Sequence, residues 1–290
     1  MKALKFVRIA LAVAMFACLN LSFFGFAHAF AGLFRIQLFP AVLAMNLVAI
    51  GAVLAVTALF GRVYCSVACP MGIFQDVVIR LSRWWRRKLP PARRTVPSPP
   101  KGVRYVALAF AVVATAAGFV SVGALLDGYS LYGRIATHLF RPLYSFLHNL
   151  AAAGLAGADR PILFREEIFV RGTCALVVAV LGLVGVAALA WWRGRLFCNT
   201  LCPVGSALAF AARRPLVRIA IDPAKCVKCG LCSASCKCGA IDRAAPRVDD
   251  SACVRCLDCL AACRKGAISL TARAGARKGR AEDRRHADLV

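Results

Sequence analysis

The chain has 290 residues, of which 60% are hydrophobic, and its formal net charge is +25. Soluble globular domains are typically about 45–50% apolar. A mean hydropathy of +0.69 therefore excludes an ordinary soluble domain and indicates a membrane protein.

Four apolar runs reach the length that a helix needs to cross about 30 Å of hydrocarbon. Only helices suit such runs, because lipid offers no partner to backbone polar groups and a barrel strand would alternate in polarity. We therefore predict a membrane α-helical fold with four transmembrane helices, at residues 9–30, 38–60, 105–126 and 172–192.

Lys and Arg residues predict the orientation of these helices. The flanks on one side of the membrane carry 32 basic residues, and those on the other side carry six. Positive residues accumulate on the cytoplasmic side. We expect both termini, the loop 62–104 and the C-terminal tail to lie in the cytoplasm.

The basic residues follow the membrane ends, which topology and anionic lipid headgroups explain. We therefore expect lipid contact and no nucleic-acid partner. The run RLSRWWRRK at 80–88 has the spacing of an interfacial helix on this surface. The first apolar run also fits a secretory signal ending in AHA at 27–29, and cleavage there would leave every later segment on the same side.

A twelve-residue motif occurs twice, as GRVYCSVACPMG at 61–72 and GRLFCNTLCPVG at 194–205, with six identical positions. Each copy follows an apolar run, so we predict two duplicated hairpins related by an axis along the membrane normal. Such packing would bring both motifs together on the cytoplasmic face. Within each CxxxCP motif the two cysteines are spaced to share a helical face, and the proline suits a helix start or a kink.

Three uses of the four motif cysteines stay open from the sequence. They could bind a further metal centre or cluster, act as redox-active thiols, or serve as buried packing residues. The residues concerned are Cys65, Cys69, Cys198 and Cys202.

The tail contains two CxxCxxCxxxC segments, CVKCGLCSASC at 226–236 and CVRCLDCLAAC at 253–263, within a repeat of 27 residues. Three thiolates on a tight loop can reach three corners of an iron–sulfur cube, and in two-cluster ferredoxins the fourth cysteine ligates the other cluster. We predict one [4Fe-4S] cluster on Cys226, Cys229, Cys232 and Cys263, and a second on Cys236, Cys253, Cys256 and Cys259.

Other readings of the tail cysteines are weaker. Zinc ribbons use CxxC pairs with a longer spacer. A disulfide framework is implausible in the cytoplasm, because thiols stay reduced there. Cys238 could replace Cys236 as a ligand.

Lys237 and Arg264 stand where proline usually follows the fourth cysteine, and their charge should raise the reduction potentials of the clusters.

The segment between the third and fourth predicted spans carries two histidines, His138 and His148. They could accept protons at a quinol-oxidising site on the outer face. Alternatively, they belong to an amphipathic helix on that surface, with Tyr and His at headgroup level.

The predicted domain order follows from these features. The segments are a first hairpin (1–61), a basic loop with the first CxxxCP motif (62–104), a second hairpin (105–192) with outer loop 127–170, a second motif with linker (193–220), a C-terminal two-cluster ferredoxin-like α+β domain (221–270), and a disordered tail (271–290).

With four predicted spans, two CxxxCP motifs and paired cluster motifs, the chain resembles, over nearly its full length, the membrane-bound ferredoxin-type family that includes NapH- and MauN-like quinol dehydrogenase subunits. The resemblance implies electron transfer at a bacterial inner membrane, between the quinone pool and a redox partner such as a ferredoxin, a cytochrome or a reductase subunit. An alternative is an accessory factor that matures or reactivates a respiratory metalloenzyme with the clusters as reductant. Whether the chain is itself an enzyme stays open, as does the direction of electron flow.

Overall fold

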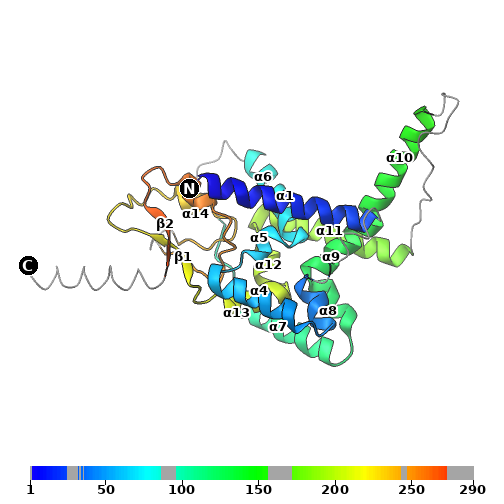
Figure 1. The fold of residues 1–290 in the computed structure, drawn as a ribbon, viewed down its shortest axis with the longest axis horizontal. Coiled ribbons are helices and arrows are strands. Elements are labelled where there is room, and N and C mark those ends of the chain that lie inside the picture. Colours follow the sequence, from blue (N-terminus) through cyan, green and yellow to red (C-terminus); the bar gives the residue numbers. More distant parts are fainter. Residues whose placement is uncertain are drawn as a thin grey trace, which may run out of the picture.

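The computed structural model describes residues 2–24, 32, 34, 36–85, 96–155, 172–242 and 247–272, and these form a helical body with a small two-stranded tail (Figure 1). The last six residues of the first predicted span, 25–30, lie outside the described residues. So does nearly all of the predicted disordered tail.

Two helices of the described residues are long and apolar enough to cross a membrane: α1 (Lys2–Phe24) and α11 (Thr173–Arg193). Length and composition alone are weak evidence, since an N-terminal signal sequence passes the same test. The basic residues of α1 lie in its first two turns, and Arg193 ends α11. The charged ends of both helices therefore lie toward the tail (Figure 1).

The other two predicted spans are interrupted, so four membrane helices are not confirmed. Residues 38–60 form α3 (Leu38–Leu43) and α4 (Leu47–Phe60), separated at Met45, whose φ is 52°. Asn46 begins α4 by accepting a hydrogen bond from the Ala49 amide at 3.1 Å.

The third predicted span breaks at a glycine. Residues 105–126 belong to α7 (Lys101–Ala116) and α8 (Val120–Leu126), and Gly118 between them has a φ of 90°. A left-handed backbone suits glycine, which has no Cβ to clash. The chain reverses here, and α8 packs against α7 with Gly123 beside Thr115.

The segment predicted as an outer loop contains a continuous helix in its described part. It comprises α9 (Gly128–Ile135), the π-helical segment η4 (Ala136–Phe140) and α10 (Arg141–Leu155). Asp127 caps the start of α9 by accepting a hydrogen bond from the Ser130 amide at 2.8 Å.

Each CxxxCP motif forms a short helix, a break and a second helix. The first motif gives α5 (Tyr64–Val67) and α6 (Pro70–Trp85), and the second gives α12 (Leu196–Thr200) and α13 (Pro203–Ala211). The prediction that the proline starts a helix is confirmed. The prediction that both cysteines share one helical face is wrong, because the helix breaks before the second cysteine of each motif.

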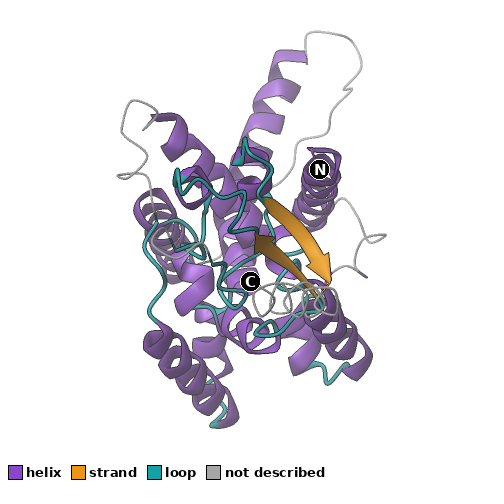
Figure 2. Cartoon of the chain, turned by 90° about the vertical axis from the view of Figure 1, so that its left-hand side faces the viewer, coloured by secondary structure: helices purple, strands orange, loops and turns teal. Residues whose placement is uncertain are grey.

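The tail, which here means residues 217–272, begins and ends with a pair of antiparallel strands. These strands are β1 (Val217–Ile221) and β2 (Ile268–Ala272), shown in Figure 2. Between them lie two short helices, α14 (Leu231–Ser235) and α15 (Asp258–Ala262), which pack together. These helices start 27 residues apart, as the repeat requires.

Strand pairing repeats as well. Ile221 pairs with Ile268 in the sheet, and the bridge between Ile241 and Val248 is the 27-residue equivalent of that pair. The tail is therefore an α+β unit with internal twofold similarity. Buried side chains of this unit and of both CxxxCP motifs form one continuous core.

Candidate metal centres

The two cysteine loops of the tail share an unusual backbone. Lys228 and Arg255 occupy equivalent positions of the repeat and have φ values of 52° and 56°. Gly230 and Leu257 are likewise equivalent, at 74° and 62°. A left-handed conformation is rare for a bulky residue and is typically retained where a site depends on the loop shape.

The structure brings together the first predicted set of cysteines around a cavity of about 200 Å³. Cys229 is exposed to solvent and the other three are half-buried. The set consists of Cys226, Cys229, Cys232 and Cys263.

The second predicted set is buried. Burial raises the pKa of the Cys259 thiol, and its neighbours Cys256, Cys253 and Cys236 raise it further. Burial also raises the pKa of Cys236, whose thiol lies close to that of Cys256. All four thiols therefore gather at one place inside the tail.

Cys238 is buried beside the same group. Burial raises the pKa of its thiol, and Cys236, Cys256 and Cys253 lie near enough to affect it. Cys236 already accepts a hydrogen bond through its sulfur from the Ala240 amide at 3.3 Å. Cys236 and Cys238 therefore both lie beside Cys253 and Cys256, so each is placed to be the fourth ligand of the second set.

The CxxxCP cysteines form a third group of thiols. Cys69 lies near Cys198 and Cys65, and Cys202 lies near Cys198 and Cys69, so the four thiols lie close together. They are between 3% and 8% exposed. The duplication correctly predicted that the two motifs would meet.

Hydrogen-bond donors point at the sulfurs of this group. The Gln75 amide donates to Sγ of Cys198 at 3.3 Å, and the Gly205 amide donates to Sγ of Cys202 at 3.4 Å at the start of α13. Burial raises the pKa of the Cys198 and Cys202 thiols, and these donors act against that shift because they favour the thiolate, which is the form that binds metals. The donor set thus suits a metal centre.

Asp127 adds a carboxyl group to the surroundings of these thiols. Its negative charge adds to the raised pKa of the Cys69 and Cys202 thiols. Burial raises the pKa of Asp127 itself to about 6. The sequence placed Asp127 at the start of a loop on the opposite membrane face. That placement is wrong, because the reversal at Gly118 returns the chain to the motifs.

Two buried arginines lock the motifs to each other. Arg62 donates through Nη2 to the carbonyl of Cys198 at 2.9 Å, and Arg195 donates through Nη1 to the carbonyl of Cys65 at 2.7 Å. Both side chains are fully buried. The sequence shows the repeated GR dipeptide, but it does not indicate that these arginines join the two motifs.

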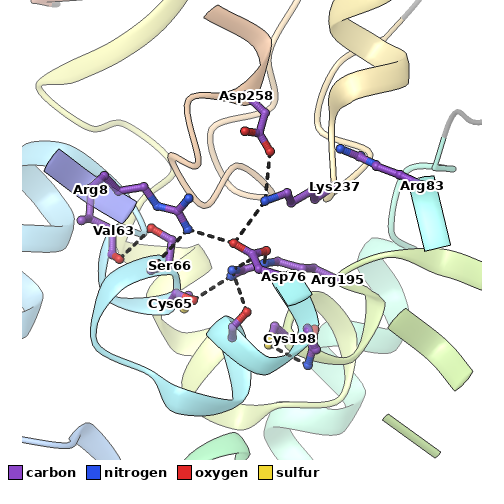
Figure 3. A network of polar contacts seen from close by, with 12 residues as sticks. Arg8, Val63, Cys65, Ser66, Asp76, Arg83, Arg195, Cys198, Lys237 and Asp258 are labelled. Atoms are coloured by element: carbon purple, nitrogen blue, oxygen red, sulfur yellow. Dashed lines mark hydrogen bonds and ion pairs between the residues drawn. The ribbon is translucent and has the colours of Figure 1, made fainter. Parts of the chain in front are cut away.

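Asp76 on α6 links four parts of the chain (Figure 3). Its carboxylate pairs with Arg8 of α1 at 2.9 Å, with Arg195 at 2.8 Å, and with Lys237 of the tail at 3.2 Å. Burial by itself raises the pKa of Asp76, but these three positive charges outweigh it and hold the pKa well below its usual range.

Lys237 therefore has a structural position that the sequence did not reveal. Its Nζ lies 3.0 Å from Asp258 and 3.2 Å from Asp76 (Figure 3), so two carboxylates balance the charge that was expected to act on a cluster. Its carbonyl accepts a hydrogen bond from the Arg195 amide at 2.9 Å. The residue after Cys236 thus attaches the tail to both motifs.

His138 and His148 lie on the continuous helix of α9, η4 and α10, and His138 is within its π-helical segment. His148 packs beside the ring of Tyr144, with centroids 5.9 Å apart. The structure does not bring the two histidines to the motif cysteines. A quinol site here stays a hypothesis.

Among the described residues, no group of three or more His, Cys, Asp or Glu side chains converges closely enough to hold a single metal ion. A [4Fe-4S] cluster takes one thiolate on each of four irons, so its ligands surround a cube and do not meet at one ion. Each of the three groups contains four cysteines, which is the number of thiolates that one such cluster takes.

A family described as "4Fe-4S binding domain" matches the chain twice, at residues 42–89 and 175–221. The two matches support a ferredoxin-type iron–sulfur protein with two [4Fe-4S] clusters and an electron-transfer role. Both matched segments contain a CxxxCP motif, and the second ends just before Cys226. The third thiol group therefore lies within the matched segments.

Two curated relatives are uncharacterized proteins of Methanocaldococcus jannaschii. MJ0750 is 23% identical over 63% of this chain and 62% of its own length. MJ0749 is 27% identical over 61% of this chain and 51% of its own length. The chain thus spans less than two thirds of either relative. No solved structure gives a significant match.

Proposed function

We propose that the protein is a membrane-anchored electron carrier that passes electrons between the quinone pool, or a membrane partner, and a redox partner through two [4Fe-4S] clusters. The observation that carries the proposal is a gradient of burial. The motif thiols and the second tail set are buried in one core, whereas the first tail set opens to solvent.

Each tail set would hold one cluster, which supplies a one-electron redox centre when bound. Cys226, Cys229 and Cys232 hold three positions from one loop, and Cys263 crosses from the other copy of the repeat. Cys236 crosses in the opposite direction to Cys253, Cys256 and Cys259. This exchange keeps both sites in one rigid unit, which favours fast electron transfer because little has to reorganise.

Membrane anchoring is supported by exposed apolar side chains on α1 and α11. Val7 and Leu11 of α1 and Leu181 and Val184 of α11 are all more than half exposed. Such surfaces are unfavourable in water and favourable in lipid. The proposed topology places the tail, with the basic ends of these helices, in the cytoplasm.

The CxxxCP thiols are proposed to hold a further metal centre between the membrane helices and the tail. Their burial, the donors at their sulfurs and their place inside the family matches support this role. Redox-active thiols are the alternative. The carbonyls of Cys65 and Cys198 are fixed by the two arginines, so the thiols are held in place before anything binds.

The rim of the first tail set is proposed to receive the soluble partner. Four exposed basic residues surround this cavity, with Asp242 as an acidic neighbour and Asp222 pairing with one of them at 3.7 Å. Electron-transfer contacts are small and depend on charge for encounter. An acidic redox protein fits the rim formed by Lys225, Lys228, Arg264 and Lys265.

Iron content in anaerobically purified full-length protein tests the cluster assignment. We expect Cys229→Ser and Cys253→Ser each to lose about four irons and one set of cluster signals in electron paramagnetic resonance. Cys65→Ser distinguishes a third cluster, because about twelve irons would then fall to about eight. Cys174→Ser, an exposed thiol outside all three groups, is the matched control.

Quinol-dependent reduction of the clusters in membranes tests the electron source. Reduction by added quinol supports the proposal, and clusters that stay oxidised under those conditions while dithionite reduces them would exclude the quinone pool as donor. If His138→Ala and His148→Ala leave quinol oxidation intact, the histidines do not form the quinol site.

A further inference from the structure

A basic cavity of about 350 Å³ lies where the start of α1, the end of α6 and the tail meet. It is distinct from the cavity of the first cysteine set and from the motif thiols. The polar residues that line it are Lys5, Arg80, Arg83, Ser235, Lys237 and Asp258.

Positive charge exceeds negative charge around this cavity. Asp258 is the acidic residue of the lining, and it already pairs with Lys5 at 2.7 Å and with Lys237 at 3.0 Å. Lys237 shares its charge with Asp76 as well. The two arginines of α6 therefore contribute positive charge that Asp258 does not balance.

Arg83 shows an unused donor at the same place. Its Nη1 donates to the carbonyl of Ser235 at 2.8 Å, whereas its buried Nη2 has no hydrogen-bond partner among the described residues. A buried donor without a partner is unfavourable, because it has lost its hydrogen bonds to water. Arg83 lines the cavity, so an anion bound there would meet a guanidinium group that has a donor without a partner.

We propose that this cavity binds a phosphate group. Phosphate oxygens match the forked donors of arginine and accept charge-assisted hydrogen bonds. Arg80 and Arg83 lie one turn apart on α6, so their guanidinium groups can share one anion. Lys5 and Ser235 extend the site toward α1 and the tail.

The surroundings favour the phosphate of an anionic phospholipid over free phosphate. Trp84 and Trp85 follow Arg83 directly and are 57% and 73% exposed. Tryptophan at such a position is typical of the headgroup level of a membrane. Leu4 and Val7 of α1 flank Lys5 and are exposed, and they offer an apolar surface to acyl chains. Basic pockets beside membrane helices on the cytoplasmic side are known lipid-headgroup sites.

The test uses the full-length protein, purified in detergent and stripped of lipid. Phosphatidylglycerol, phosphatidylcholine and inorganic phosphate are titrated separately, with the thermal midpoint and native mass spectrometry as readouts. We expect saturable binding of phosphatidylglycerol and about fivefold weaker binding in Arg80→Gln, because one basic residue near a membrane surface contributes about that factor. Lys5→Gln should weaken binding similarly.

Arg214→Gln, an exposed arginine outside the cavity, is the matched control and should bind like the wild type. Saturable binding of inorganic phosphate, weakened by Arg80→Gln, would support the site with free phosphate as its occupant. If neither ligand binds saturably, or if Arg80→Gln and Lys5→Gln both bind phosphatidylglycerol like the wild type, the proposal is wrong. None of these readouts depends on the clusters.

Discussion

Arg62 and Arg195 form reciprocal hydrogen bonds between the two CxxxCP motifs: each donates to the carbonyl of the first cysteine of the other motif, at 2.9 and 2.7 Å. They are 133 residues apart and occupy equivalent positions of the repeat. Arg62 also donates a hydrogen bond to the side chain of Asn199, and Arg195 also donates one to Asp76. The duplication is therefore also a reciprocal hydrogen-bond exchange inside the core.

This exchange predicts that neither arginine can be shortened without loss of stability. Arg62→Met would leave the carbonyl of Cys198 and the side chain of Asn199 buried without their donor. Each such group costs about 1–3 kcal/mol, so we expect the free energy of unfolding to fall by about 2–6 kcal/mol. Thermal unfolding of the detergent-solubilised protein measures it.

Arg214→Met serves as control for the Arg62 experiment, since Arg214 is exposed. Its free energy of unfolding should change by no more than an ordinary surface substitution changes it, about 0.5 kcal/mol. Equal midpoints for Arg62→Met and Arg214→Met would contradict the role given to the exchange.

A second prediction concerns Gly72 and Gly205, which are the last residues of the two twelve-residue motifs. A Cβ on Gly72 would lie 2.1 Å from the carbonyl oxygen of Cys65, and one on Gly205 would lie 2.1 Å from that of Cys198. Contacts this short force the backbone to move. We expect Gly72→Ala and Gly205→Ala each to lower stability by several kcal/mol and to displace the motif cysteines.

Helical glycines elsewhere provide the control for this experiment. Added Cβ atoms at Gly51 in α4 and Gly185 in α11 meet nothing within 4 Å. Alanine there should be neutral or should stabilise by up to about 1 kcal/mol, because alanine is the better helix former. If all four variants unfold alike, the close approach of α6 to α5 is not what requires glycine.

The sequence predicted the parts of the molecule that depend on repetition. The 27-residue repeat appears in the structure as the equivalent helices α14 and α15, and the 133-residue repeat correctly predicted that the motif cysteines would come together. Both follow from local pattern, since equivalent segments fold alike and then pack on each other. Pro70 and Pro203 likewise began helices, because proline fits the first turn.

The sequence did not predict the breaks inside the apolar runs. Met45 interrupts 38–60 without any turn-forming dipeptide, and Gly118 resembles the other glycines scattered through the helices. Periodicity does not distinguish a straight span from a reversed pair of helices when every residue is apolar. The position of Asp127 beside the thiols was missed for the same reason.

The role of Asp76 was also missed, although the sequence holds a signal. It is the sole acidic residue of the first 126, in a chain with 38 basic ones. A lone carboxylate in such surroundings is an obvious partner for buried cations. Which cations it meets depends on tertiary packing, because Arg8, Arg195 and Lys237 come from distant segments.

A third prediction is that Asp76→Asn loosens the tail from the motif helices. The substitution leaves the three cations without their counter-charge, which typically costs about 3–5 kcal/mol for a buried pair. The loss at neutral pH should appear as a lower thermal midpoint. It should also appear as faster hydrogen exchange in the segment around Lys237.

The pH dependence of this loss follows from the lowered pKa of Asp76. A carboxyl with a depressed folded pKa stabilises fully above its unfolded pKa of about 3.9 and loses that contribution as the pH falls through the folded value. The gap between wild type and Asp76→Asn should therefore stay constant from pH 7 to about 5 and shrink below about 4.

Asp222→Asn is the control for the Asp76 experiment. Asp222 forms a solvent-exposed pair with Lys225 at 3.7 Å, and such pairs contribute about 0–1 kcal/mol. Its midpoint should hardly change at any pH. A gap for Asp76→Asn that narrows already between pH 7 and 5 would show that another group governs the attachment of the tail.

The last prediction concerns the basic rim of the first cysteine set. If an acidic carrier docks there, its electron-transfer rate should fall steeply with ionic strength, because salt shortens the Debye length from about 8 Å at 0.15 M to about 3 Å at 1 M. Lys265→Glu should lower the low-salt rate by about tenfold or more and flatten the salt dependence, since steering is worth a factor of about 10–10³. Stopped-flow oxidation or reduction by an acidic flavodoxin measures both effects. A neutral zwitterionic viologen should react equally with both proteins, because it gains nothing from steering, and Arg214→Glu should keep the wild-type salt slope. An unchanged slope in Lys265→Glu would mean that the carrier docks away from the rim, whereas slow reaction with the viologen would mean that the cluster itself is damaged.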